Sequence, residues 1–267
     1  MKIAVCIKQV PATTKVEVDP KTGILKREGI DSKLNPYDLY ALETALRIKA
    51  ALAGTSITVF TMGPPQSEEI IREAYMMGVD DGFILSDGAF AGSDVLATSW
   101  TLAQGILETG PFDLIICGKQ STDGDTAQVG SELAEFLNIP HLCNVLHITE
   151  LDQNSLTVEM DLPLHRQRAI VRLPALLAVE KGIYEPRLPS FLKQKATADR
   201  PVRRLKLSDL PDQDKNHYGL DGSATQVARI FPPETNQVRV TWDGPEDETA
   251  QKAFELLVKG KFLQQTR

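Results

Sequence analysis

The stretch from residue 112 to residue 140 constrains the fold of this chain more than any other part. Residues 112–117 form a short apolar run between Pro111 and Gly118, which predicts a strand covered on both faces of a sheet. A polar turn follows, and apolar residues then recur with helical spacing until Pro140. Strand, turn and helix in this order are typical of open α/β sheets, which bind nucleotides at the carboxyl ends of their strands.

The expected start of this helix is a candidate phosphate site. Asp125 can cap the helix, and Gln128 lies three positions later, in the spacing of a capping box. The free amides of residues 126–130 would then face the crevice and could bind a diphosphate. Asp123 and Asp125 bring two carboxylates close to that anion, and like charges repel. This conflict disappears if Asp125 caps the helix and Asp123 faces a ribose hydroxyl.

These residues leave a second interpretation open. Neither GxxxxGK[ST] nor GxGxxG occurs in the chain. An ordinary loop before a well-capped helix would have the same spacing. The pattern therefore favours a nucleotide site but does not identify the nucleotide.

Strands and helices are expected to alternate before this stretch. Strands are predicted at 2–8, 55–62 and 82–86, helices from Asn35-Pro36 and at 66–77 and 93–109, and a hairpin-like excursion at 19–23. This order predicts an α/β fold with a mostly parallel, doubly wound, Rossmann-like sheet. The strand ends at Cys6, Met62 and Cys117 would lie along one edge, around one ligand. After Pro140, β-rich segments at 141–150, 155–162, 168–173 and 175–179 extend the same domain.

Composition argues against two classes of partner. The net charge of -7 is weak evidence against nucleic acid. No stretch approaches the ~20 apolar residues of a membrane span, and the apolar run at the amino terminus is too short for a signal peptide. We therefore expect a cytoplasmic protein without a membrane span.

The cysteines and histidines do not predict a metal site. Cys6, Cys117 and Cys143 lie far apart in or beside apolar runs, and no CxxC occurs, so they are expected to be small buried residues. The four histidines lack metal-ligand spacing. We expect no metal and no iron–sulfur cluster on this chain.

Five motifs carry the interpretation further. They are IKQVP (7–11), LNPYDLYALETAL (34–46), TMGPPQ (61–66), GKQSTDGDTAQVG (118–130) and YEPRLPS (184–190). In this order they resemble the β subunit of electron-transfer flavoproteins, over most of the chain. The run at 18–38, the TMGPP turn and the segment at 219–233 are similar to the electron-bifurcating members of that family.

The resemblance implies an adenine-nucleotide site and no catalytic residue on this chain. The positions that match the family's site are Cys6, Asn35, Asp38, Met62, Gly63, Asp123, Gly124, Asp125, Thr126, Ala127, Gln128, Val129, Gly130 and Ala134. Simple core packing for Met62 and helix capping for Asn35 remain alternatives. Residues 10–13 and 61–65 are expected to lie nearest a flavin ring.

The resemblance implies one of two cofactors. In bifurcating members the site holds the adenosine end of an FAD that takes a hydride from NADH, so NAD is a transient substrate. One electron then goes to ferredoxin or flavodoxin, and the other crosses the α-subunit FAD to a flavin dehydrogenase. In the other members the site holds a structural AMP. An unrelated adenine-nucleotide sensor or ligase is a third interpretation, but the chain lacks a phosphate-activating lysine motif.

Residues 184–206 carry the partner hypothesis. This segment is basic in an otherwise acidic chain, and Phe191 and Leu192 are apolar side chains within it. It is similar to the family's recognition loop, which implies that Phe191 and Leu192 dock on the dehydrogenase, with Arg187 and Lys193 at the rim. A solvated charged loop is the alternative. The PLH turn at 163–165 departs from the family pattern, so an acyl-CoA and a lactate or other 2-hydroxy-acid dehydrogenase both remain open.

The expected organisation has three parts. Residues 1–183 form the nucleotide-binding domain, 184–206 the recognition loop, and 207–267 an arm and helix that contact the α subunit. The apolar helical pattern at 250–258 would be weakly stable alone. We therefore expect the chain to be one half of an obligate heterodimer with the electron-transfer flavoprotein α subunit.

Overall fold

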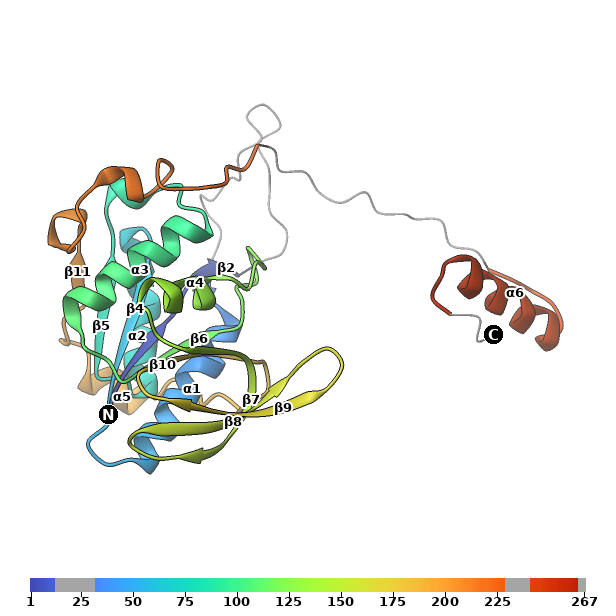
Figure 1. The fold of residues 1–267 in the computed structure, drawn as a ribbon, viewed down its shortest axis with the longest axis horizontal. Coiled ribbons are helices and arrows are strands. Elements are labelled where there is room, and N and C mark those ends of the chain that lie inside the picture. The colour runs from blue at the N-terminus through green and yellow to red at the C-terminus, as the bar shows by residue number, and fades with distance from the viewer. Residues whose placement is uncertain (13–31, 229–240, 264–267) are drawn as a thin grey trace. The chain divides into compact units, whose positions relative to one another are not determined.

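The computed structural model of the chain describes residues 1–12, 32–228 and 241–263. Its largest feature is a nine-stranded sheet with the order β11-β5-β4-β1-β6-β10-β7-β8-β9 (Figure 1). Its strands are β1 (Lys2–Cys6), β4 (Ser56–Met62), β5 (Asp81–Leu85), β6 (Leu114–Gly118), β7 (His141–Leu151), β8 (Ser155–Asp161), β9 (Arg166–Arg172), β10 (Ala175–Val179) and β11 (Arg203–Leu205). A separate antiparallel pair consists of β2 (Gln9–Pro11) and β3 (Ser32–Leu34).

Helices cover both faces of the parallel part of the sheet. The first core cluster contains α1 (Pro36–Ala51) and α2 (Glu68–Met77), packed on one face. The second contains α3 (Val95–Thr109) and α4 (Val129–Phe136), packed on the other. Because strand side chains alternate, Ile115 faces the second cluster and Ile116 the first. The predicted mostly parallel, doubly wound sheet is confirmed.

The winding direction changes beside β1. From β1 the chain proceeds to β4 and then β5, and α3 carries it back to β6, on the other side of β1. Loops that leave β1 and β6 therefore run to opposite faces of the sheet. Such a divergence opens a crevice at the carboxyl ends of the two strands.

Two of the element boundaries that differ from the prediction have an identifiable cause. The helix expected from residue 93 begins at Val95, because the Asp94 carboxylate caps it by accepting from the amide of Ala97 at 3.1 Å. The strand expected at 2–8 ends at Cys6, because the Lys8 amide bonds to the Asp38 side chain. The hairpin-like excursion expected at 19–23 lies outside the described residues.

Antiparallel strands extend the sheet beyond its parallel part. β10 pairs in parallel with β6 and β7, and β8 and β9 then add in antiparallel fashion. β9 and β11 are the two edges of the sheet. Both edges carry arginines, at Arg166, Arg168 and Arg172 on β9 and at Arg203 and Arg204 on β11.

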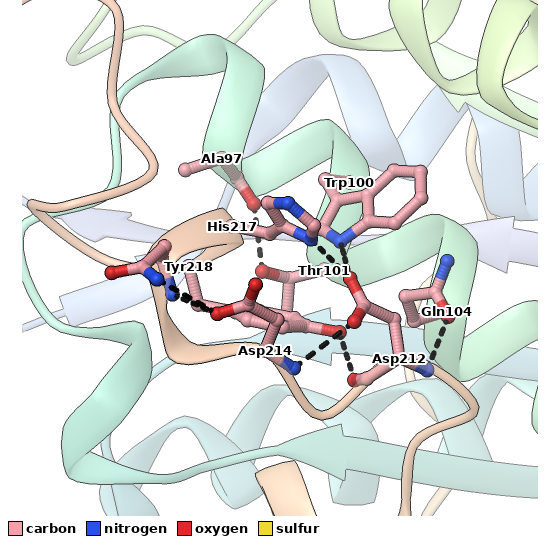
Figure 2. A network of polar contacts seen from close by, with 9 residues as sticks. Ala97, Trp100, Thr101, Gln104, Asp212, Asp214, His217 and Tyr218 are labelled. Atoms are coloured by element: carbon pink, nitrogen blue, oxygen red, sulfur yellow. Dashed lines mark hydrogen bonds and ion pairs between the residues drawn. The ribbon is translucent and has the colours of Figure 1, made fainter.

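A polar network holds the segment after β11 against α3 (Figure 2). The Asp212 carboxylate bonds to Nε1 of Trp100 at 3.0 Å and to Nδ1 of His217 at 2.6 Å. The amide of Asp212 donates to Oε1 of Gln104 at 3.0 Å, and the Tyr218 hydroxyl donates to the Asp212 carbonyl at 2.5 Å. Because these central groups are mutually satisfied, the network serves as an anchor for this segment.

The remaining short elements complete the description. They are α5 (Phe191–Ala196) and the 3-10 turns η1 (Pro65–Ser67), η2 (Gly88–Phe90), η3 (Leu207–Asp209) and η4 (Lys215–His217). The described part of residues 230–267, a separate compact unit, includes α6 (Glu246–Lys259), on which Phe254, Leu256 and Leu257 are exposed. In the described residues, the length and apolar content of every helix fall short of what a membrane crossing requires.

Candidate functional site

The crevice that the topology places at the carboxyl ends of β1 and β6 has small side chains at the strand ends. Cys6 and Cys117 are register partners at the ends of these strands, and both are almost fully buried. The hydrogen bond that the Cys117 thiol donates to Cys6, together with burial, raises the pKa of Cys117 well above its ordinary range. The Cys117 thiol is therefore held protonated, and both cysteines are small buried residues, as expected.

The side chain of Asp38 connects α1 to the chain just after β1 and to the end of β6. Its carboxylate accepts from the Lys8 amide at 2.7 Å, just after β1, and also bonds to the Gly118 amide at the end of β6. Burial raises the pKa of Asp38 to about 7, although these bonds, the Asn35 side chain and the Lys8 charge all oppose the increase. Asp38 thus fixes the geometry at the point where the loops after β1 and β6 diverge.

Gly118 permits the close approach on which this arrangement depends. A Cβ atom at Gly118 would lie 2.7 Å from the carbonyl carbon of Tyr37 and 2.8 Å from its oxygen, inside the first turn of α1. Main-chain atoms cannot move aside cheaply, so only glycine fits. Sequence reasoning missed this residue, although a glycine directly after a buried strand was a visible signal.

Asn35 occupies the cap position of α1 but does not cap it through its side chain. Instead, its Nδ2 donates to the Gln120 carbonyl at 2.9 Å, and its Oδ1 accepts from the Thr122 amide at 3.3 Å. The capping expectation for Asn35 was wrong in this respect. Its side chain ties the loop after β6 to the start of α1.

The start of α4 also differs from the prediction. Asp125 is not the cap, because α4 begins at Val129 with Gln128 in the cap position. Asp125 and Ala127 have φ angles of 54° and 55°, and the Gln120 side chain bonds to the Asp125 carboxylate. Because a right-handed helix cannot include residues in this left-handed conformation, α4 begins only after Ala127.

The main chain of this loop still offers a row of donors. Within the described residues, the amides of residues 126–130 have no hydrogen-bond partner. A Cβ atom at Gly130 would lie 3.8 Å from Cβ of Cys117 and 3.5 Å from that of Ala178, so the start of α4 lies over the ends of β6 and β10. Free amides at the start of a helix are suited to an anion.

A lysine lies beside one of the two loop carboxylates. Nζ of Lys8 contacts Oδ1 of Asp123 at 2.7 Å and Oγ of Ser121 at 3.4 Å. Burial acts to raise the pKa of Asp123, but the hydrogen bond and charge of Lys8 outweigh burial and hold it below its ordinary value. The sequence interpretation did not consider Lys8.

The other predicted site residues range from fully buried to exposed. Ala134 is fully buried, while Met62 and Val129 are partly buried against the second core cluster. A Cβ atom at Gly63 would lie 2.5 Å from Oγ of Ser67. Gly124 and Thr126 are exposed in the loop. The structure thus brings the predicted residues of β1, α1, β6 and α4 to one crevice edge, with Met62 and Gly63 at the end of β4.

The docking segment, which is the predicted recognition loop at residues 184–206, is bonded to the rest of its domain more closely than expected. Arg187 forms two bonds to the Glu43 carboxylate, at 2.7 and 3.0 Å, and the Lys193 ammonium donates to the Met77 carbonyl at 2.9 Å. Glu43 is only 3% exposed, and the bonds and charge of Arg187 lower its pKa although burial opposes them. These two cations therefore act as anchors of the segment.

Two apolar side chains on this segment face solvent. Residues 191–196, expected to be a loop, form α5 because the Ser190 side chain caps it. Phe191 is 66% exposed and Leu192 is 78% exposed. The segment therefore presents apolar side chains from a short helix fastened at its base.

Comparisons with known proteins agree with the motifs. A family model described as an electron transfer flavoprotein domain matches residues 22–210. The chain is 43% identical over 239 residues to subunit CarD of the caffeyl-CoA reductase-Etf complex of Acetobacterium woodii, covering 87% of this chain and 88% of the relative. It is 41% identical over 258 residues to the electron transfer flavoprotein subunit beta of Thermoanaerobacterium thermosaccharolyticum, covering 96% and 98%. It is 36% identical over 269 residues to protein FixA of Bradyrhizobium diazoefficiens, covering 98% and 92%.

Proposed function

The chain belongs to the electron transfer flavoprotein family, and on that premise we propose that it is a β subunit whose crevice holds the adenosine end of FAD. The observation that supports this most is the arrangement at the β1 and β6 ends. Small side chains at the strand ends lie near free amides at the start of α4, so an adenine group and a diphosphate would both find suitable surroundings.

The proposed complex is of the electron-bifurcating type and works in the cytoplasm. When bound, FAD supplies the redox chemistry, accepting a hydride from NADH and sending electrons to ferredoxin or flavodoxin and to the α-subunit FAD. The residues of this chain bind and orient that cofactor. Support comes from the motifs at 18–38, 61–65 and 219–233, which resemble bifurcating members.

The electron acceptor beyond the α subunit is proposed to be a flavin dehydrogenase of the acyl-CoA type. The relative in the caffeyl-CoA reductase-Etf complex favours this class, while a 2-hydroxy-acid type such as lactate dehydrogenase remains the second candidate. Phe191 and Leu192 would form the apolar contact.

We also propose that the carboxyl-terminal part, from residue 207, contacts the α subunit. The exposed apolar side chains on α6, including Phe254 and Leu257, support this role. An exposed apolar helix face gains stability when a partner covers it. The chain would then be stable only as part of a heterodimer.

The alternative is a β subunit that holds a structural AMP in the same crevice. The deciding experiment is the nucleotide content of the chain copurified with its α subunit, measured by denaturing extraction and chromatography. Two FAD and no AMP per heterodimer would support the bifurcating function, and NADH oxidation with ferredoxin would then be assayed. One FAD and one AMP would reduce this chain to a scaffold and docking subunit.

A further inference from the structure

The main chain of Lys8 is held by hydrogen bonds at both its amide and its carbonyl, whereas its side chain is half exposed. Its amide donates to the Asp38 carboxylate at 2.7 Å, and its carbonyl accepts from the Asn35 amide at 2.9 Å. Its side chain, in contrast, is 47% exposed. The ammonium group can therefore change partners without any movement of β1 or α1.

The present partner of Lys8 is a carboxylate of the candidate nucleotide loop. Both Asp123 oxygens lie within 2.8 Å of Nζ. Ser121, in the same loop, is the other contact, at 3.4 Å. A half-exposed ion pair of this kind contributes at most about 1 kcal/mol to stability, so exchange of its partner is energetically cheap.

The charges around the crevice do not otherwise favour an anion. Asp123 and Asp125 lie in the loop itself. Lys119, the next lysine at this edge, is paired with Glu180 at 2.7 Å. Without Lys8, free amides alone would have to hold a diphosphate beside these loop carboxylates. In the part of the chain that the structure describes, Lys8 is the cation in contact with one of them.

We propose that Lys8 is the specificity-determining counter-charge of this crevice, held by Asp123 until a phosphate group of an adenine nucleotide takes its place or shares it. This role rests on the proposed nucleotide site. Lys8 then favours phosphate-bearing ligands over adenosine, while Asp123 competes with the phosphate for the same ammonium. The two residues act in opposite directions on a single quantity, the ratio of ADP affinity to adenosine affinity.

The test is calorimetric titration of adenosine, AMP and ADP into the full chain with its α subunit, after bound nucleotide has been removed. Lys8→Met is expected to lower the ratio of ADP to adenosine affinity at least about tenfold, the size of a lost charge-assisted contact. Asp123→Asn is expected to raise that ratio, even if adenosine itself binds more weakly. Lys8→Arg, which retains the charge, should keep the ratio near the wild-type value.

A matched control comes from a lysine pair at the other end of the sheet. Lys49 forms an ion pair of the same kind, with its Nζ 2.5 Å from Oδ1 of Asp80. Lys49→Met should leave the ratio of ADP affinity to adenosine affinity unchanged. The ADP affinity of the wild-type protein should also fall with added salt more steeply than that of Lys8→Met.

The outcomes separate this inference from the proposed function. If ADP and adenosine both bind but their ratio is the same in wild-type and Lys8→Met protein, the role of Lys8 is overturned and the nucleotide site stands. If none of the three compounds binds the wild-type protein, the proposed nucleotide site is wrong, and the role of Lys8 is lost with it.

Discussion

The nucleotide crevice and the docking segment use side chains in opposite ways. In the crevice, polar groups on different elements bond to one another, as Asp38 does with the amides of Lys8 and Gly118. In the docking segment, the polar groups anchor its base, as Arg187 does on Glu43, while Phe191 and Leu192 remain exposed. The crevice is thus part of the fold, whereas the apolar tip of the docking segment contributes little to it.

This difference teaches how one chain could serve both the proposed retained ligand and the proposed transient partner. A cofactor site must keep its shape, so its contacts are cross-linked into the core. A contact with an electron-transfer partner must form and break quickly, which suits a small apolar patch on a fastened helix. Substitutions in the two regions should therefore change different measured quantities.

The largest effect is expected from Gly118→Ala. The new methyl group would meet the main chain of Tyr37, and we expect a loss of more than about 4 kcal/mol in the free energy of unfolding, together with loss of bound nucleotide. Chemical denaturation measures this loss. Gly88→Ala is the control, because no atom lies within 4 Å of its added Cβ. Equal stability of the two variants would show that the crevice is not built on this close approach.

A smaller effect is expected from Asp38→Asn, and it depends on pH. The folded protein holds a proton on Asp38 up to a pKa of about 7, whereas the unfolded chain releases it near 3.8. The wild-type protein should therefore lose stability relative to the variant as pH rises from 4 to 7, by no more than about 4 kcal/mol. Denaturation of both proteins across this range tests the sign. Parallel curves would mean that Asp38 ionises normally in the fold.

The smallest free-energy change is expected at the docking segment. Replacement of Phe191 and Leu192 together by Ala should slow electron transfer to the dehydrogenase about tenfold, equivalent to about 1.4 kcal/mol. Nucleotide content and stability should stay at wild-type values, because both side chains are largely exposed. Leu164→Ala, which changes another exposed leucine, is the kinetic control. Unchanged electron transfer in the double variant would show that Phe191 and Leu192 do not form the docking contact.

The sequence predicted the architecture well because the signals for it are local. Buried strands such as residues 112–117 read as apolar runs, and the order of strands and helices then restricts the sheet to few topologies. The comparisons also confirmed the family that the motifs indicated. The strands and helices beside which the candidate site residues lie could be predicted, while their role in binding a nucleotide stays a prediction.

The bonds within the crevice could not be predicted in the same way. Asn35 had the right type and position for a cap, but the loop after β6 offered its side chain a carbonyl and an amide instead. Asp125 had capping-box spacing, but its left-handed conformation delayed the helix to Val129. The Asn35 outcome depends on contacts with residues far apart in the chain, and the Asp125 outcome on a bond within its own loop that competes with capping, so helix-cap spacing records neither.

The arginines on β9 and β11 have a consequence for how copies of this protein meet. An edge strand offers main-chain donors and acceptors that a second sheet could join. Arg166, Arg168 and Arg172 border one edge, and Arg203 and Arg204 border the other. Arg166, Arg168 and Arg203 are each paired with a carboxylate of this chain, so both edges present charged side chains to an approaching copy. The sheet therefore resists growing into a continuous ribbon of molecules when the protein is concentrated.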